Sequence, residues 1–128
     1  MPENGSAPIS AFTNAANPSA PLRLCGAPHN RKGHDGLAAL VKNELHRNPF
    51  TGAVFVFRSR KADRLKLIYW DGSGLVMAYK RLEEHTFTWP DIRDGLMTLG
   101  HAQFEALFAG LDWRRVRAVE ARAPTAIE

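Results

Sequence analysis

The chain of 128 residues has one cysteine and no long run of apolar residues. A lone thiol at Cys25 excludes an internal disulfide and a zinc site built from several thiolates. No uninterrupted apolar stretch approaches the ~18 residues of a transmembrane helix, and the first residues lack the basic start and apolar stretch of a secretory signal. Together these absences predict a protein of the reducing cytoplasm.

Signatures of catalysis and of nucleotide binding are also missing. Neither GxxxxGK[ST] nor GxGxxG occurs, no GxSxG accompanies the serines, and the five histidines do not have the spacing of HExxH. We therefore expect no catalytic, cofactor-binding or metal-binding residue. One alternative stays open: Asp63, Asp71 and Asp91 are all expected at strand ends and could hold a magnesium ion for phosphodiester cleavage, although acidic residues are also ordinary turn residues.

The composition is that of one ordinary globular domain, with 45% apolar and 23% charged residues. Residues 1–21 are rich in Ala, Ser, Asn and Pro and carry almost no charge, which predicts a disordered leader. Residues 22–117 form the predicted single domain. Residues 118–128 are expected to be a flexible tail.

Three apolar runs at residues 53–57, 64–70 and 75–80 organise this domain. The first is continuously apolar, as in a strand buried on both faces, whereas the other two alternate in the manner of strands. The sequence Asp-Gly-Ser-Gly at residues 71–74 favours a tight hairpin, and the basic segment at residues 58–64 favours a second turn. These runs predict an antiparallel meander with a basic hairpin tip.

The flanking segments add strands and helices. Short strands are expected at residues 22–25, 85–90 and 96–99. One helix is expected to be capped by Asp35 and to stop at Asn48 before a proline, and another to span residues 101–109 and end at Gly110. The predicted fold class is α+β, with a small antiparallel sheet of four to five strands and two principal helices.

Charge is distributed unevenly along the chain. Residues 29–82 carry a net charge of +7, whereas residues 83–112 carry −5. Such a division predicts a basic face for a polyanion, although a surface with scattered, solvated charges is an equally open interpretation. The candidate nucleic-acid-binding residues are the basic ones of this region: Arg31, Lys32, Arg58, Arg60, Lys61, Arg64, Lys66, Lys80 and Arg81.

Two further features have a functional and a structural interpretation. Arg31 and Lys32 precede a helix start, where backbone N–H groups favour an anion, but they also suit a plain solvated approach to a helix. Aromatic residues near the basic ones suggest a stacking platform for single-stranded nucleic acid, although aromatics of a small sheet commonly lie in its core. Lys66 shares a strand face with Trp70, which favours binding; the aromatic residues concerned are Tyr69, Trp70, Phe87, Trp89 and Trp113.

An ordered set of short motifs resembles a known family. RKGHDGLAALV at residues 31–41 is followed by NPFTG at 48–52, VFVFR at 54–58, YWD at 69–71, YKRLE at 79–83, WP at 89–90 and LDW at 111–113. Over roughly residues 31–115 the chain is similar to TnpB, the accessory protein of IS66-type bacterial insertion sequences. It does not resemble the RNA-guided nuclease that shares this name.

The resemblance implies a protein that is encoded beside a DDE transposase and required with it for transposition, with no catalytic residues of its own. Implied partners are DNA at the ends of the insertion sequence or at its target, the transposase and another accessory protein of the element. The chain departs from the usual pattern at His29-Asn30, where Asp-Met is typical, and at Gly100-His101, where a Thr/Ser-Pro pair usually opens the second helix.

We therefore predict a non-catalytic accessory factor for DNA transposition that contacts the DNA backbone through the basic hairpin, assists the transposase, or does both. The alternative is a protein-interaction adaptor for the transposase that does not itself bind DNA. A metal-dependent nuclease is the third hypothesis.

Overall fold

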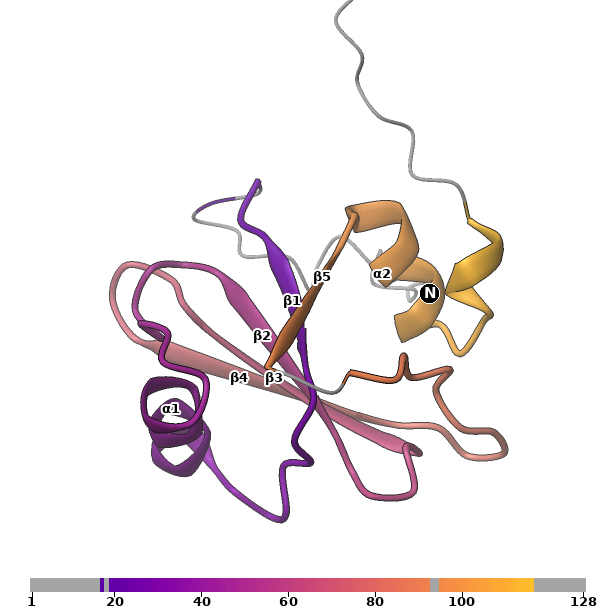
Figure 1. Cartoon of the computed structure of the whole chain (residues 1–128), viewed down its shortest axis with the longest axis horizontal. Coiled ribbons are helices and arrows are strands. Elements are labelled where there is room, and N and C mark those ends of the chain that lie inside the picture. Colours follow the sequence, from indigo (N-terminus) through magenta and orange to yellow (C-terminus); the bar gives the residue numbers. More distant parts are fainter. Residues whose placement is uncertain (1–16, 18, 93–94, 117–128) are drawn as a thin grey trace, which may run out of the picture.

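The computed structural model describes residue 17 and residues 19–92 and 95–116. Most of the predicted leader at residues 1–21 and all of the predicted tail at residues 118–128 lie outside these described residues. Five strands form one sheet in the order β4-β3-β2-β1-β5, with two helices and a short 3₁₀ helix (Figure 1). The elements are β1 (Leu22–Cys25), α1 (His34–Asn43), β2 (Val54–Arg58), β3 (Arg64–Trp70), β4 (Leu75–Arg81), β5 (Leu96–Leu99), α2 (His101–Phe108) and η2 (Trp113–Arg115).

The predicted meander is confirmed in strands β2, β3 and β4. Both pairings are antiparallel, and Leu67 in the middle strand lies opposite Val56 on one side and Ala78 on the other. The hairpin between β3 and β4 is held by the Asp71 carboxylate, which accepts hydrogen bonds from the backbone N–H groups of Ser73 (2.8 Å) and Gly74 (2.9 Å). Local bonding by aspartate is the chemistry that predicted this turn.

The α+β class with five strands and two helices is confirmed, but the sheet is mixed rather than antiparallel throughout. β1 pairs in parallel with β2 and antiparallel with β5. A parallel pair needs a long crossover, and the segment between β1 and β2 contains α1 and is long enough to supply it.

The prediction of a strand at residues 85–90 is wrong. β5 is the next strand after β4 along the sequence, but it lies at the opposite edge of the sheet. The connecting chain must therefore cross roughly 19 Å of sheet width. This segment is fixed by single contacts instead of a ladder: the Phe87 N–H bonds the Ala62 carbonyl (2.6 Å), and the Trp113 indole N–H bonds the Thr88 carbonyl.

The first helix differs from its predicted limits. Gly33 is its N-cap, and Asp35 lies in the first turn, where a carboxylate still favours the positive end of the helix dipole. The helix ends at Asn43, well before Asn48, because His46 takes a left-handed conformation (φ 53°) that cannot continue a helix. α2 agrees closely with prediction.

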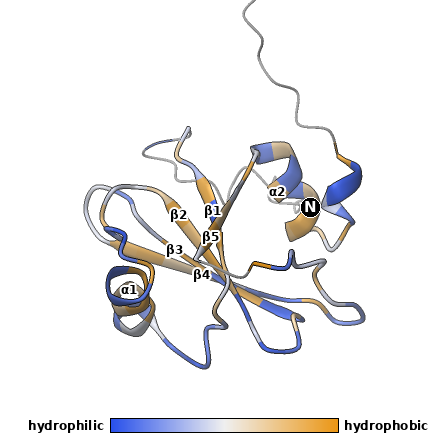
Figure 2. Ribbon diagram, in the orientation of Figure 1, coloured by the Kyte–Doolittle hydropathy of each residue, from blue (hydrophilic) through white to orange (hydrophobic). Residues whose placement is uncertain are grey.

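Each face of the sheet carries one helix and one hydrophobic core (Figures 1 and 2). β2 is buried on both faces, as its continuously apolar sequence predicts. The α2 core contains Leu22, Leu24, Val54, Val56, Leu65, Leu67, Phe87, Leu99, Phe104, Ala106, Leu107, Phe108 and Trp113. The α1 core contains Cys25, Leu37, Leu40, Val41, Ala53, Phe55, Phe57 and Ile68.

Neither helix in the described part of the chain has the length and apolar character needed to cross a lipid bilayer.

Candidate nucleic-acid interface

The parallel pairing of β1 and β2 brings two basic segments together. Both strands leave the sheet at the same end, so the turn before α1 lies beside the β2–β3 hairpin (Figure 1). The His29 N–H bonds the Arg58 carbonyl (2.9 Å), and the Arg60 guanidinium donates to the Asn30 side-chain oxygen (3.3 Å). Arg31 thus shares one surface with Arg60 and Arg64, although these arginines lie 29 and 33 positions further along the chain.

The turn before α1 has an unusual backbone. The Lys32 N–H bonds the His29 carbonyl (2.8 Å), and both residues between them have positive φ, 44° at Asn30 and 66° at Arg31. Asparagine tolerates this conformation, but arginine adopts it at a cost of about 1 kcal/mol. The conformation sets Arg31 beside the β2–β3 hairpin, where it lines two neighbouring cavities.

The hairpin tip is stiffened by side-chain hydrogen bonds. The Ser59 hydroxyl donates to the Asp63 carboxylate (3.0 Å) and accepts from the Arg64 N–H (3.2 Å). The Ser59 N–H also bonds the Arg64 carbonyl (2.9 Å). The Asp63 carboxylate is therefore engaged in a hydrogen bond within the turn. The side chains of Arg60 and Lys61 are exposed and extend from a backbone that these bonds hold in place.

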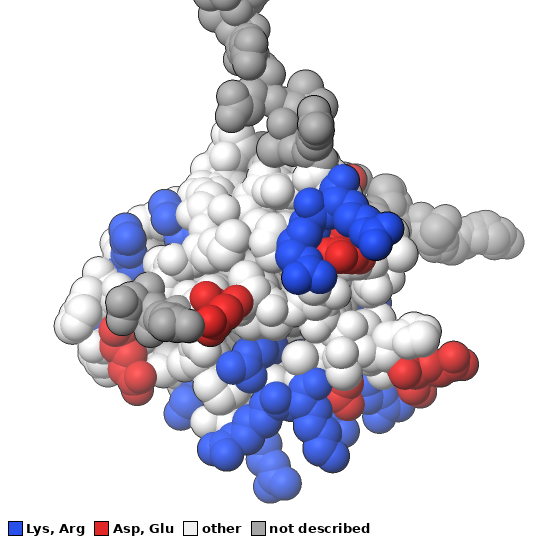
Figure 3. Space-filling model, turned by 45° about the vertical axis from the view of Figure 1, so that its right-hand side comes forward, with Lys and Arg blue, Asp and Glu red and all other residues white. Residues whose placement is uncertain are grey.

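Two adjoining cavities lie at this end of the sheet. The tip cavity, about 370 Å³, is lined by Arg31, Ser59, Arg60, Lys61, Asp63 and Arg64. The strand cavity, about 400 Å³, is lined by His29, Arg31, Arg64, Lys66, Met77 and Tyr79. Arg31 and Arg64 border both. Figure 3 shows Lys and Arg side chains gathered at the lower end of the molecule, the end of these loops in Figure 1.

Lys66 connects this surface to the start of α1. Its ammonium donates to the Lys32 carbonyl (2.8 Å) and lies 5.7 Å from the centroid of the Tyr79 ring. An ammonium has three N–H donors, so Lys66 keeps donors for a ligand. The structure thus brings six predicted site residues to one end of the fold: Arg31, Lys32, Arg60, Lys61, Arg64 and Lys66.

The other three predicted residues lie differently. Arg58 pairs across strands with Leu65, which faces the α2 core, and its guanidinium donates to the Ser59 carbonyl (3.2 Å). Arg81 lies opposite Arg64 but forms an exposed ion pair with Glu83 (3.2 Å).

Lys80 points to the opposite face of the sheet from Lys66. Its ammonium donates to the Phe108 carbonyl at the end of α2 (2.6 Å) and lies 4.3 Å from the Phe108 ring centroid. Partial burial lowers the pKa of Lys80. This lysine therefore packs against α2 and is not grouped with the basic end.

Sequence reasoning missed three residues of the strand cavity: His29, Met77 and Tyr79. His29 is 6% exposed, and neither nitrogen of its imidazole has a hydrogen-bond partner. Burial, and then the positive charges of Lys66 and Arg64, lower the pKa of His29 to about 4. Nothing in the histidine spacing signals this site. Tyr79 is 52% exposed and lies opposite Lys66, a neighbour that only the strand register reveals.

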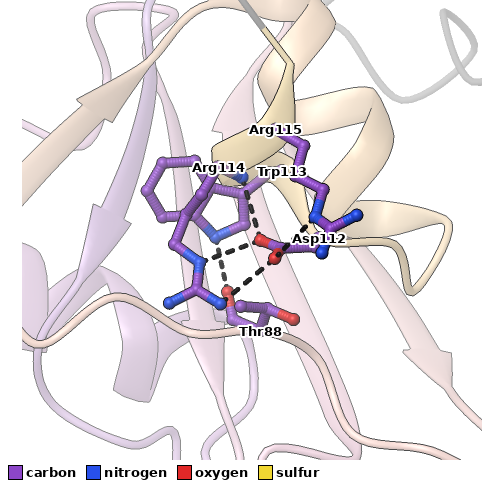
Figure 4. A network of polar contacts seen from close by, with 5 residues as sticks. All are labelled: Thr88, Asp112, Trp113, Arg114 and Arg115. Atoms are coloured by element: carbon purple, nitrogen blue, oxygen red, sulfur yellow. Dashed lines mark hydrogen bonds and ion pairs between the residues drawn. The ribbon is translucent and has the colours of Figure 1, made fainter.

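Most aromatics of the proposed stacking platform belong to the interior. Phe87 and Trp113 are buried in the α2 core, and Tyr69 and Trp89 pack against it. Trp113 also donates its indole N–H to the Thr88 carbonyl, while Asp112 beside it pairs with Arg114 and Arg115 (Figure 4). Trp70 does share the face of Lys66, as expected, but packs edge-on against Phe50 with ring centroids 5.5 Å apart.

The carboxylates of the nuclease alternative do not come together. Asp63 and Asp71 lie beyond opposite ends of β3, which spans about 20 Å. Each is engaged in its own turn. Within residues 17, 19–92 and 95–116, no three His, Cys, Asp or Glu side chains form a group able to hold a metal ion.

Comparison with known proteins agrees with the sequence motifs. The family described as IS66 Orf2 like protein matches residues 24–118. Uncharacterized protein y4jC of Sinorhizobium fredii is 42% identical over 113 residues, which cover 86% of this chain and 97% of the relative. Uncharacterized protein y4hO of the same organism is 40% identical over 84 residues, covering 66% and 73%. No solved structure matches the chain.

The family match covers most of the chain and includes both basic segments and the two cavities. It associates the protein with transposition in an accessory role. The chain therefore belongs to the IS66 Orf2-like family of insertion-sequence proteins.

Proposed function

We propose that this protein is a non-catalytic accessory factor of transposition that binds the DNA backbone, in the cytoplasm, through the basic end of its sheet. The observation that carries the proposal is the convergence of two separate segments on one surface: the turn before α1, and the β2–β3 hairpin together with the start of β3. Arginine and lysine on fixed backbone neutralise phosphates and release counterions, which gives affinity that depends strongly on salt and little on base sequence.

The experiment is a salt titration of binding to duplex DNA, with a matched pair of double variants. Arg60 and Lys61 are exposed at the hairpin tip, whereas Arg114 and Arg115 are exposed on η2 and pair with Asp112. Each pair removes two positive charges when changed to alanine. We expect R60A/K61A to reduce the slope of log affinity against log salt by about 2, since each phosphate contact contributes ~0.9.

The R114A/R115A variant should keep the slope of the parent protein, provided that circular dichroism shows both variants folded. Equal losses in the two variants would mean that only net charge matters, and no binding by the parent at low salt would remove the proposal.

A second candidate is an adaptor for the DDE transposase or for another protein of the element. β4 is an edge strand of the sheet, and edge strands accept a strand from a partner. An adaptor would copurify with the transposase after nuclease treatment and would not bind DNA at physiological salt. A proline at Leu75, the first residue of β4, whose backbone N–H points away from β3, should then prevent copurification while R60A/K61A leaves it intact.

A further inference from the structure

The strand cavity has two chemically different sides. Positive charge comes from Arg31, Arg64 and Lys66, whereas β4 contributes the apolar side chain of Met77 and the ring of Tyr79. Its volume of about 400 Å³ lies in the range of small-molecule sites. A surface that only contacts a phosphate backbone needs the positive side chains, but it does not need the apolar side chain or the ring.

His29 forms a polar part of the same cavity that the fold itself leaves unsatisfied. The imidazole is more than nine-tenths buried, and both of its nitrogens lack a hydrogen-bond partner. Leaving a buried polar group without a partner costs about 1–3 kcal/mol, so such groups are rare, and a bound ion is one way in which they are satisfied. The charged neighbours of the ring are Lys66 and Arg64, which are both positive. An anion bound between them would offset this positive charge.

Tyr79 offers a surface for stacking. It is 52% exposed although it lies in a strand, and its ring is close to the Lys66 ammonium. Aromatic side chains beside positive charge bind single-stranded nucleic acid by stacking on its bases, whereas the bases of a duplex are already stacked on one another.

We propose that the strand cavity holds one unpaired nucleotide of single-stranded DNA, with its phosphate against Arg31, Arg64 and Lys66 and its base on Tyr79. The inference rests on the proposed DNA binding by the same surface and adds a preference for unpaired strands.

The test compares a short oligothymidylate with a duplex that has the same number of phosphates, using fluorescence anisotropy. We expect the parent to bind the single strand more tightly. Y79S should lose about 5- to 150-fold in affinity for the single strand, as expected for one stacked base, and should keep its affinity for the duplex. Y79F keeps the ring and should behave as the parent does.

Phe50 provides a matched control, because it is also 52% exposed and packs against Trp70 on the same face as Lys66. F50S should leave both affinities unchanged. A Y79S variant that binds the single strand as the parent does, or that loses both affinities equally, would overturn the nucleotide cavity. Salt-dependent duplex binding in the parent would then still support the proposed function, whereas its absence would remove that function as well.

A second measurement does not depend on variants. Titration of the parent with thymidine 5′-monophosphate should shift the imidazole NMR signals of His29 and raise its pKa, because a bound phosphate offsets the neighbouring positive charges. Unchanged His29 signals at saturating nucleotide would contradict the proposal.

Discussion

The Lys80 ammonium closes the C-terminus of α2, with a 2.6 Å hydrogen bond to the Phe108 carbonyl and a 4.3 Å approach to the Phe108 ring centroid. Both contacts favour positive charge, one through the helix dipole and the other through the aromatic ring. Lys66, on the other face, is placed among the groups of the strand cavity. The two lysines, on adjoining strands, thus have different tasks: Lys80 stabilises the end of α2, whereas Lys66 belongs to the strand cavity.

The first prediction separates these tasks by substitution. K80M should lower the free energy of unfolding by about 1–2 kcal/mol, because it removes a charged hydrogen bond and a cation–π contact, while DNA affinity stays unchanged. K66M should reduce DNA affinity. Urea denaturation and a binding titration of both variants check this; a K80M variant that lost affinity as K66M does would show that Lys80 also reaches the DNA.

A pH dependence follows from His29. Burial and the charges of Lys66 and Arg64 lower its pKa from 6.5 to about 4, so the folded protein keeps the imidazole neutral while the unfolded chain takes up a proton. Acid then favours the unfolded chain, and stability should fall as pH drops from about 7 to about 4. The contribution is about 3 kcal/mol over that interval.

Thermal unfolding at several pH values measures this effect by difference. H29Q cannot take up the proton, so its stability should fall less than that of the parent between pH 7 and 4. Parallel curves for the two proteins would show that His29 does not contribute.

Cys25 should resist thiol reagents in the folded protein. The side chain is fully buried in the α1 core, and burial raises the pKa of its thiol far above the usual range. Reactive thiolate is therefore absent until the core opens, and labelling should proceed at the rate of unfolding. A kinetic assay with a chromogenic disulfide checks this, since Cys25 is the only cysteine; rapid labelling without denaturant would contradict it.

The β3–β4 hairpin offers a matched pair of glycines. Gly72 has φ 102°, whereas Gly74 does not have a positive φ, and an added Cβ meets nothing within 4 Å at either position. G72A should therefore lower stability by about 1 kcal/mol through backbone strain alone. G74A should not lower it. Denaturation midpoints compare the two, and equal effects would exclude the conformational explanation.

Local patterns in the sequence predict the meander, both helices and the basic end well. The alternation in residues 64–70 correctly places Leu65 and Leu67 on one face and Lys66 and Ile68 on the other. Alternation in residues 75–80 likewise places Tyr79 and Lys80 on opposite faces of the sheet. Only the register between β3 and β4 reveals that Tyr79 lies opposite Lys66 and that Lys80 lies opposite Leu65. A group made of all the basic residues that are close in sequence therefore combines side chains from both faces of the sheet.

Long-range pairing explains the remaining differences. No local pattern states that β1 lies between β2 and β5, and this placement is what takes the chain after β4, described as far as residue 92, across the sheet instead of along its edge. The burial of His29 depends on the same pairing, since its N–H bonds the Arg58 carbonyl. A histidine in a polar loop sequence gives no sign of a neighbour 29 positions away.

The interior place of β1 also matters while the protein is being made. β1 leaves the ribosome before both of its neighbours in the sheet: β2 follows early, whereas β5 is complete only with Leu99. A product truncated after β4 would lack β5, α2 and the core they complete, and would expose the β1 edge and an apolar sheet face. The sheet can therefore close only after β5 has been made, and products truncated before β5 should aggregate or be degraded.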